Sequence, residues 1–423
     1  MHIVFLLDSY FPHRNPSANC ADIYIQKLKR NHDISIISPS TTIQKALSYN
    51  VGGIDIYYIT NYWNSLRSWC NYHINAKRNI GFYKFILFLV RIYGVLLSFF
   101  LFPTRFAWLI EKYVNCVESI IEKKNVDVIF SVSDPICAHL AAQKIKKKYP
   151  QIRWITYTTD PFAFSERNKK KSLRVRQKYM ILEKSIYDES DVNIFTQELY
   201  DFNLKEFDII PVNNFAFPYV LSDFENLKSP DCKIINSSKP TFLYAGALMK
   251  KIRHPEFALF TLSKLKDYEV FFYTAGDCED ILQRYESDNI HINSLIPREK
   301  YMNLITKEAD FLINIGNIND LQSPSKFLEL ISTGKPIVNF YKKKDANYNM
   351  AERYPLGINI GEEDEDSVNK LLMFCKENIG KKLSFNELVT IFPENVLESQ
   401  LQRLEYLLDQ KNSTDCSRYN DVK

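Results

Sequence analysis

Short apolar runs that end at turn residues alternate along the chain with segments of helical spacing. The first run, MHIVFLLDSYFP, is bounded by Asp8 and Pro12, which is typical of a strand buried on both faces of a parallel sheet. Residues 13–20 then indicate a loop, residues 21–29 have helical spacing, and residues 33–39 form a second apolar run. This order predicts one βα unit followed by its parallel strand.

The same pattern returns further along the first half of the chain. The run NVDVIFSVSDP brings Asp134 to the carboxyl end of a strand, and QIRWITYTTDPFAF brings Asp160 to the end of the next. Ligands of open parallel sheets bind beside such strand ends, so both carboxylates are candidate functional residues. A plain Asx turn is the alternative role for each of them. We expect His139, on the helix between the two strands, to be packed in the core.

The most apolar segment of the chain covers residues 82–102 and is interrupted only by Lys84 and Arg91 before it stops at Pro103. A helix that spans a membrane needs about 20 predominantly apolar residues, and an arginine at its centre costs roughly 2.5 to 3.5 kcal/mol. Three interpretations therefore stay open: a membrane-spanning helix, a core helix, or a helix that lies on a membrane surface. Its crowded aromatic residues and nearby bases favour the surface helix.

A second series of strands and helices follows residues 222–239, a linker rich in Ser, Pro, Asn and Lys. PTFLYAGALMKKIRHPEFALF predicts a strand, a glycine turn and a helix, and EVFFYTAGD predicts the next strand. We therefore expect one α/β domain over residues 1–222 and another over residues 240–390. Residues 391–410 are expected to form a final amphipathic helix.

The stretch SPSKFLELISTGKPIVNF, residues 323–340, predicts a capped helix, a glycine turn at Gly334 and a buried strand. The N–H groups of Ser325 and Lys326 should point outward at the helix start, where the helix dipole and the lysine charge together suit a phosphate or diphosphate. Glu329 lies on the same helix face as Lys326, and its carboxylate suits two vicinal hydroxyls such as those of a ribose.

The length and the charge of the chain limit the number of domains and the kinds of partner that we expect. A chain of 423 residues suits two domains, and its net charge of +4 is small. Bases nevertheless cluster at residues 144–150, 168–178 and 342–344. Such clusters attract anionic lipid head groups or phosphorylated substrates, although a solvated surface is their commoner role. We expect no nucleic-acid partner.

Several other classes of site are not expected. The eight cysteines include no C-x-x-C pair and no His partner at zinc spacing, so we expect neither a disulfide framework nor a metal site, and a reducing cytosol fits. Residues 1–7 lack a basic stretch before the apolar run, so no signal peptide is expected. Residues 13–20 do not match G-x-G-x-x-G, which argues against NAD or FAD.

The 323–340 stretch resembles the signature of the GT4-type retaining glycosyltransferases of the GT-B fold, with its proline-serine-lysine step, glutamate and G-K-P-I-V. In that family the helix start holds the nucleotide diphosphate and the glutamate binds the ribose, which implies those roles for Ser325, Lys326 and Glu329. The family's second glutamate, which faces the donor sugar, is Leu321 here. The resemblance implies an α/β chain of two Rossmann-like, doubly wound domains with an interdomain cleft.

The resemblance also implies roles for residues of the first turn in the second domain. Gly246 matches the glycine that lets the backbone approach the diphosphate. Arg253 is our candidate for the cation that grips the phosphate oxygens, with Lys250 and Lys251 as alternatives. A charge-assisted bond of this kind contributes about 1.5 to 3 kcal/mol, so the loss of the correct one should be conspicuous.

Further site residues are implied on both domains. The loop containing Leu295 and Ile296 is expected to contact the nucleotide base. On the acceptor side of the cleft, small residues replace the family's glycines in the first loop, and Asn19 of this loop is a candidate site residue. Asp134 and Asp160, at the ends of two strands, are the other acceptor-side candidates. The final helix is expected to pack back towards the first domain.

The implied reaction transfers a sugar from a nucleotide-diphosphate sugar to a saccharide or lipid-linked glycan, with retention and without a metal or cofactor. We expect the protein in the cytoplasm, peripherally attached to the anionic inner face of the cell membrane, in surface polysaccharide assembly. Two alternatives stay open. One is a nucleotide-sugar epimerase on the same fold, and the other is a non-catalytic partner subunit, which Leu321 and the missing glycines make plausible.

Overall fold

The computed structural model describes residues 1–10, 15–40, 48–133, 136–224, 233–317 and 325–410. The chain divides into two compact units. One consists of residues 1–217 together with the segment from Leu401 onward, and the other of Pro218–Gln400. Each unit contains its own sheet and its own hydrophobic core.

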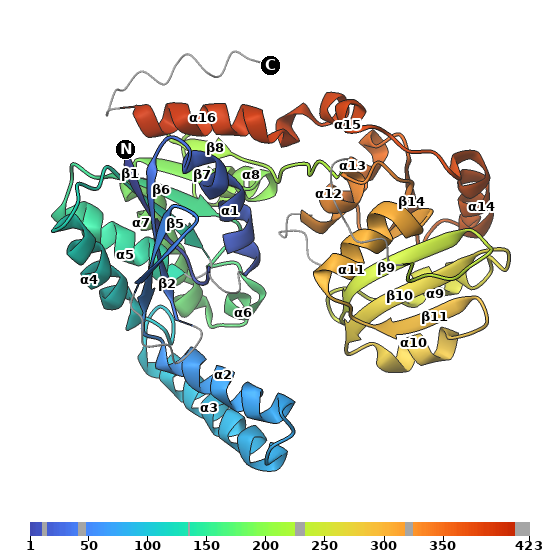
Figure 1. Ribbon diagram of the computed structural model, residues 1–423, viewed down its shortest axis with the longest axis horizontal. Coiled ribbons are helices and arrows are strands. Elements are labelled where there is room, and N and C mark those ends of the chain that lie inside the picture. The colour runs from blue at the N-terminus through green and yellow to red at the C-terminus, as the bar shows by residue number, and fades with distance from the viewer. Residues whose placement is uncertain (11–14, 41–47, 134–135, 225–232, 318–324, 411–423) are drawn as a thin grey trace. The chain divides into compact units, whose positions relative to one another are not determined.

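The first unit is built on a sheet with the strand order β3-β4-β2-β1-β5-β6-β7-β8 (Figure 1). Neighbouring strands pair in parallel except β3 and β4, which are antiparallel. Central strands β1 and β5 are buried along their whole length, which confirms the interpretation of their continuous apolar runs. The strands are β1 (His2–Leu6), β2 (Asp33–Pro39), β3 (Ser48–Val51), β4 (Ile54–Ile59), β5 (Val128–Ser133), β6 (Arg153–Thr158), β7 (Val192–Phe195) and β8 (Asn214–Ala216).

Helices of the first unit pack on this sheet through buried apolar side chains such as Tyr113, Val117 and Ala141. His139 is buried between the hydroxyls of Ser131, at 2.8 Å, and Thr158, at 3.2 Å, which confirms that it is a packed histidine. Burial lowers its pKa to about 3. The helices are α1 (Pro16–Leu28), α2 (Tyr62–Asn75), α3 (Ile80–Phe100), α4 (Leu109–Ile121), α5 (Ile136–Lys148), α6 (Glu166–Lys169), α7 (Leu173–Glu189) and α8 (Gln197–Glu206).

Helix α1 begins earlier than the sequence pattern indicated, so the expectation of a loop over residues 16–20 is wrong. The side-chain oxygen of Asn15 accepts the backbone N–H of Ala18 at 2.8 Å, and Pro16 stands at the first helical position. A capping side chain and a proline at this place start a helix even where apolar periodicity is weak. The small residues at 17–19 lack the apolar spacing of a helix, so the sequence pattern does not reveal the first turn of α1.

Helices α2 and α3 form a hairpin that extends away from the sheet of the first unit, in blue (Figure 1). Over Ile80–Leu97, α3 is long and apolar enough to cross a membrane, yet only 6% of this segment is buried in the molecule. The interpretation of α3 as a core helix is therefore wrong. One face of α3 packs on α2, where Tyr93 stacks on Trp63 with ring centroids 5.8 Å apart.

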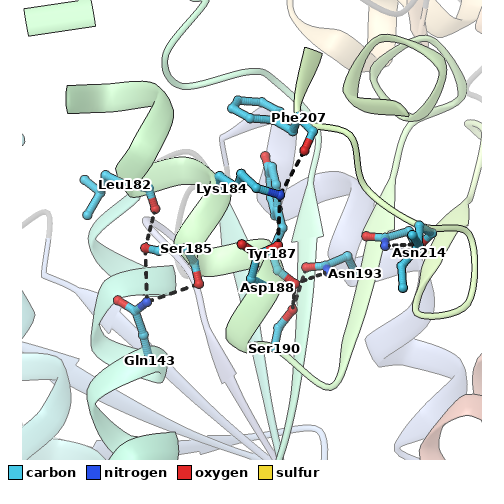
Figure 2. Close-up of polar contacts among 11 residues, drawn as sticks. Gln143, Leu182, Lys184, Ser185, Tyr187, Asp188, Ser190, Asn193, Phe207 and Asn214 are labelled. Carbon is cyan, nitrogen blue, oxygen red and sulfur yellow. Dashed lines mark hydrogen bonds and ion pairs between the residues drawn. The ribbon is translucent and has the colours of Figure 1, made fainter. Parts of the chain in front are cut away.

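Polar contacts hold helix α7 against its neighbours in the first unit (Figure 2). Gln143 of α5 donates to the carbonyl and the hydroxyl oxygen of Ser185, both at 3.3 Å. Ser190 donates to the Asn193 side chain at 2.7 Å, and Asn193 donates to the Tyr187 carbonyl at 2.8 Å. The side chains of Ser190 and Asn193 are buried, so these bonds replace the hydrogen bonds to water that the two side chains lose on folding. The same bonds fix the position at which β7 begins.

The second unit carries a sheet of parallel strands in the order β11-β10-β9-β12-β13-β14 (Figure 1). Aromatic rings line its core, and Phe242 stacks on Phe311 with centroids 4.9 Å apart. The strands are β9 (Thr241–Leu248), β10 (Glu269–Gly276), β11 (Ile290–Ser294), β12 (Phe311–Ile315), β13 (Ile337–Tyr341) and β14 (Gly357–Gly361).

The helices of the second unit include α12, which confirms the short helix expected before Gly334. Gly334 has φ of +73°, and a side chain there would meet the Leu383 carbonyl, so the turn requires glycine. The helices are α9 (Glu256–Leu262), α10 (Glu279–Tyr285), α11 (Arg298–Asn303), the π-helical turn η1 (Leu304–Glu308), α12 (Ser325–Ile331), α13 (Ala346–Arg353), α14 (Ser367–Asn378), α15 (Phe385–Ile391), the 3₁₀ turn η2 (Pro393–Asn395) and α16 (Leu397–Asp409).

Helix α16 contributes to both units. Within the second unit, Gln400 donates to the carbonyls of Pro218 and Glu394, both at 2.8 Å. Within the first unit, the Arg403 guanidinium lies 4.9 Å from the Phe215 ring centroid, and Glu405 accepts from His32 at 2.7 Å. The last turns of α16 therefore pack on the first unit.

Candidate functional site

The candidate site of the second unit centres on Gly246, near the carboxyl end of β9. Gly246 has φ of +156°, a conformation that residues with a Cβ rarely adopt, and a Cβ there would overlap the Lys326 ammonium. Lys326, in the first turn of α12, donates to the Ala245 carbonyl. The structure thus brings together Gly246 and Lys326, which stand 80 positions apart in the sequence.

Lys326 is a largely buried cation in aromatic surroundings. Its ammonium lies 5.8 Å from the Tyr244 ring centroid and 5.6 Å from that of Tyr301. The pKa of Lys326 is lowered to about 8, mainly by burial and also by repulsion from Arg253 and Arg298, while the negative charge of Glu329 acts in the opposite direction. A lysine pKa that burial and neighbouring charges perturb in this way marks a candidate functional site.

Arg253 lies close enough to Lys326 for its positive charge to lower the pKa of the lysine. Its guanidinium donates to the side-chain oxygen of Asn317 from Nε at 3.1 Å and from Nη2 at 2.8 Å. Burial raises the pKa of Tyr244, and the neighbouring Arg253 charge opposes that rise. Lys250, by contrast, forms an ion pair with Asp280 at 2.7 Å. Of the cations considered for this turn, Arg253 is the one whose charge acts on Lys326.

Glu329 follows Lys326 along the same face of α12. Its carboxylate accepts from Arg298 at 2.5 Å and from the Tyr301 hydroxyl at 2.9 Å. The side chain is 18% exposed. A carboxylate has about four acceptor positions, so a ligand hydroxyl can still be accepted beside these two bonds. The ribose role of Glu329 stays a prediction.

The other predicted residues of this unit differ in exposure. Leu295, which follows β11, is 52% exposed, whereas Ile296 is partly buried and packs on the core below the α12 helix. Ser325, the first residue of α12, is exposed. Leu321 lies outside the described residues, as does the Ser-Pro pair that precedes Ser325.

In the first unit, Asp160 stands directly after the end of β6. Desolvation raises its pKa, and a 3.4 Å hydrogen bond from Thr159 opposes this rise. The Thr159 hydroxyl also lies 3.0 Å from that of Ser17, in the first turn of α1. Asn19, in the same turn, is exposed. Asp134 lies outside the described residues.

Four residues around Lys326 and Arg253 were missed by the sequence analysis: Tyr244, Asn317, Arg298 and Tyr301. Tyr244 lies two positions before Gly246 on β9, so strand alternation places it on the same sheet face. Arg298 and Tyr301 are three positions apart and share a face of α11, which is the signal for a joint role. Asn317 has no such signal beyond its place after β12.

Within the described part of the chain, no group of three or more His, Cys, Asp or Glu side chains is placed to hold a metal ion. Among the described residues, the charges that act on Lys326 are those of Arg253, Arg298 and Glu329, so with Lys326 itself three bases accompany one carboxylate. An anionic ligand at Gly246 would relieve the mutual repulsion of the bases.

Comparisons with known proteins bear on the fold. No protein-family model and no curated protein sequence matches the chain. Its structure is similar to a sucrose-phosphate synthase from Thermosynechococcus elongatus, with TM-score 0.66 and 9% identity, covering 96% of this chain and 98% of that one. It is also similar to OtsA in its apo form, with TM-score 0.64 and 11% identity over 97% of this chain and 100% of that one.

The lipopolysaccharide outer core galactosyltransferase WaaB in its apo form is a further similar structure. It gives TM-score 0.58 and 12% identity over 96% of this chain and 99% of that one. At these identities the likeness concerns the fold. Two Rossmann-like sheets of mostly parallel strands, matched over nearly the whole length of these proteins, show that the chain has the GT-B fold.

Proposed function

We propose that the protein is a retaining glycosyltransferase that uses a nucleotide-diphosphate sugar as its donor. The observation that carries this proposal is that Lys326 lies against Gly246 while the positive charge of Arg253 acts on Lys326. A largely buried ammonium and a guanidinium that repel each other favour a negative partner, and a diphosphate supplies at least two negative charges.

The arrangement supports departure of a diphosphate. As the bond between the sugar and the phosphate breaks, negative charge grows on the leaving oxygen. Fixed cations therefore stabilise the transition state more than they stabilise the bound donor. Lys326 is held by the Ala245 carbonyl and Arg253 by Asn317, so neither cation has to be reorganised during the reaction. Transfer of the sugar then requires an acceptor hydroxyl.

The finer parts of the proposal concern the acceptor. We propose a saccharide or lipid-linked glycan in surface polysaccharide synthesis. The likeness to a lipopolysaccharide outer core galactosyltransferase supports this choice. The use of a uridine nucleotide is supported by a similar structure described as bound with UDP-2-fluoro glucose, with TM-score 0.60. Asp160 and Asn19 are the acceptor-side candidates on the first unit.

A thermal-shift screen with nucleotide sugars and free nucleotides tests the proposal. A donor that binds the folded chain stabilises it by mass action, by about 2.7 kcal/mol at a hundredfold excess over its dissociation constant. We expect at least one nucleotide sugar to raise Tm, and the free diphosphate to do so as well. The absence of a shift with every nucleotide would contradict the proposal and favour the partner subunit.

The epimerase alternative makes a different product. Incubation of the chain with the stabilising nucleotide sugar, without any acceptor, would release an isomeric nucleotide sugar if the protein is an epimerase. We expect only slow hydrolysis of the donor under these conditions. Formation of the isomer would replace the glycosyltransferase proposal.

Replacing Glu329 with glutamine is expected to weaken donor binding and to lower kcat/KM together, each by about tenfold. A ribose contact exists in the bound donor and in the transition state alike, so KM and kcat/KM should change while kcat changes little. The amide still accepts one of the bonds from Arg298 and Tyr301, so stability should fall only modestly. Titration with the donor and a melting curve measure both effects.

The opposite result would identify Glu329 as a packing residue. In that case Glu329→Gln would bind the donor normally and melt markedly earlier than the unchanged chain. Glu387→Gln is a suitable control, because Glu387 is an exposed carboxylate in the capping box of α15 and faces no part of the candidate site.

A further inference from the structure

The α2–α3 hairpin presents an apolar face that the described part of the molecule leaves uncovered. At 100° per residue, the exposed side chains of α3 cover one broad arc of the helix, opposite the arc that packs on α2. Each of them is between 42% and 57% exposed. They are Phe82, Phe85, Phe88, Leu89, Ile92, Val95 and Leu96.

Aromatic side chains continue this face onto α2. Trp69 of α2 lies edge-on to Tyr83 of α3 with centroids 5.1 Å apart, and Tyr83 stacks on His73 at 4.5 Å. Phe82 and Tyr72 contact the same group of rings at 5.4 Å each. Tyr72 is 65% exposed. Both helices therefore contribute to one apolar and aromatic surface near the turn of the hairpin.

The charge of the hairpin has one sign. Between Asp55 and Glu111 the sequence contains no Asp or Glu, and it contains six bases, namely Arg67, Lys77, Arg78, Lys84, Arg91 and Arg105. Lys77 and Arg78 lie in the turn between the helices and are exposed. Lys84 and Arg91 are seven positions apart, so they share one edge of the apolar arc of α3.

The geometry of the hairpin argues against a span. Both ends of the hairpin join the same unit, at β4 and α4, so α3 could cross a membrane only if α2 crossed it as well. Helix α2 has 14 residues and reaches about 21 Å at 1.5 Å per residue, against about 30 Å of hydrocarbon. It also carries Asn64, Arg67 and Asn71, which have no partner in lipid.

We propose that the α2–α3 hairpin docks on the surface of an anionic membrane, with its apolar face in the interface and its bases at the phosphate head groups. Amphipathic helices that bind membranes in this way combine aromatic residues with lysine and arginine. Attraction to an anionic leaflet contributes about 1 kcal/mol for each base near it, equivalent to about fivefold in affinity. This inference does not depend on the proposed glycosyltransferase activity.

A second copy of the chain is the less suitable occupant. A symmetric pair would bring the same patch of each copy together, so the five bases within one hairpin would face those of the other without any carboxylate from either hairpin. Like charges opposed in this way weaken association. An anionic lipid surface instead supplies the missing opposite charge over the whole length of the hairpin.

Sedimentation of the full-length protein with vesicles tests the proposal. We expect binding to phosphatidylcholine vesicles that contain phosphatidylglycerol, at least about tenfold weaker binding to pure phosphatidylcholine, and release at high salt. The paired change Lys77→Glu with Arg78→Glu should weaken binding by about thirtyfold or more. The control Lys381→Glu with Lys382→Glu, an exposed basic pair of the second unit, should bind as the unchanged chain does.

The apolar face has its own matched pair of variants. Phe85→Ser with Phe88→Ser should weaken vesicle binding by about tenfold or more. The control Phe260→Ser with Met373→Ser, at two exposed apolar positions of the second unit, should leave binding unchanged. Circular dichroism and the Tm of each variant check that the chain still folds, since exposed positions contribute little to stability.

Several results would overturn the proposal. Equal vesicle binding by the hairpin variants and their controls would show that other residues contact lipid. Retention in a cell membrane fraction through carbonate extraction until detergent is added would show a span. A dimer in solution that Phe85→Ser with Phe88→Ser dissociates, in a chain that does not bind vesicles, would show that the face pairs with a second copy.

Discussion

Replacing Lys326 or Arg253 with alanine is expected to lower turnover by about 100-fold or more, the scale seen when one preorganised charge-stabilising group is removed. Lys326 lies against Gly246, and the charge of Arg253 acts on Lys326, so both cations would face a diphosphate bound there. Since negative charge on that group grows in the transition state, each cation should matter more for kcat than for donor affinity. Steady-state kinetics with a saturating acceptor, together with donor titration, separates the two effects.

The two substitutions should also be coupled, because both cations would grip one group. We expect the double variant to lose less than the product of the single losses. Lys251→Ala is the control, because Lys251 is exposed in the same turn. Near-normal turnover of Arg253→Ala together with a large loss in Lys250→Ala or Lys251→Ala would assign the grip to a neighbouring lysine.

The architecture was predictable because the strands carry their own signal. Continuous apolar runs bounded by Asp, Pro or Gly indicated buried parallel strands, and β1, β5 and β13 are buried accordingly. Gly334 and the G-K-P-I-V step indicated the turn between α12 and β13, and the positive φ of Gly334 confirms it. Strand order, in contrast, depends on contacts between segments far apart in the sequence, and no local pattern records it.

The failures arise where the local pattern is incomplete. The first turn of α1 is built from small residues, so its start depends on the Asn15 cap and not on apolar spacing. The apolar run of α3 correctly predicted a helix. Composition alone does not show whether such a helix packs in the core, contacts a membrane or is exposed to solvent. The structure answers that question, because α3 packs on α2 along one face and leaves the rest exposed.

The candidate site was predictable only in part, for a related reason. Lys326 and Gly246 were identified from residues near them in the sequence, and the fold places them in contact. Asn317, which holds Arg253, and Arg298, which pairs with Glu329, come from other segments of the chain. Partners of this kind are fixed by tertiary packing, so single-sequence reasoning does not assign them.

Donor affinity is expected to depend on pH through Lys326, whose pKa is lowered to about 8 by burial and by the nearby Arg253 charge. Below pH 8 the ammonium is charged and affinity should be constant. Above pH 8 the free protein loses this proton, whereas a bound diphosphate favours the charged form and raises the lysine pKa. Affinity should therefore fall by up to about tenfold for each pH unit above 8.

Lys326→Arg separates this titration from others in the site, because a guanidinium stays charged throughout the range. The variant should bind the donor less well at neutral pH, since the arginine does not fit the contact with the Ala245 carbonyl in the same way. Its affinity should nevertheless stay flat between pH 7 and about pH 9.5, measured by isothermal titration at constant ionic strength. A decline with the same midpoint in Lys326→Arg would mean that another group titrates, and a flat profile in the unchanged chain would mean that Lys326 does not hold the anion. The expected pair of curves, one falling above pH 8 and one level, would place the charge of Lys326 on the bound diphosphate.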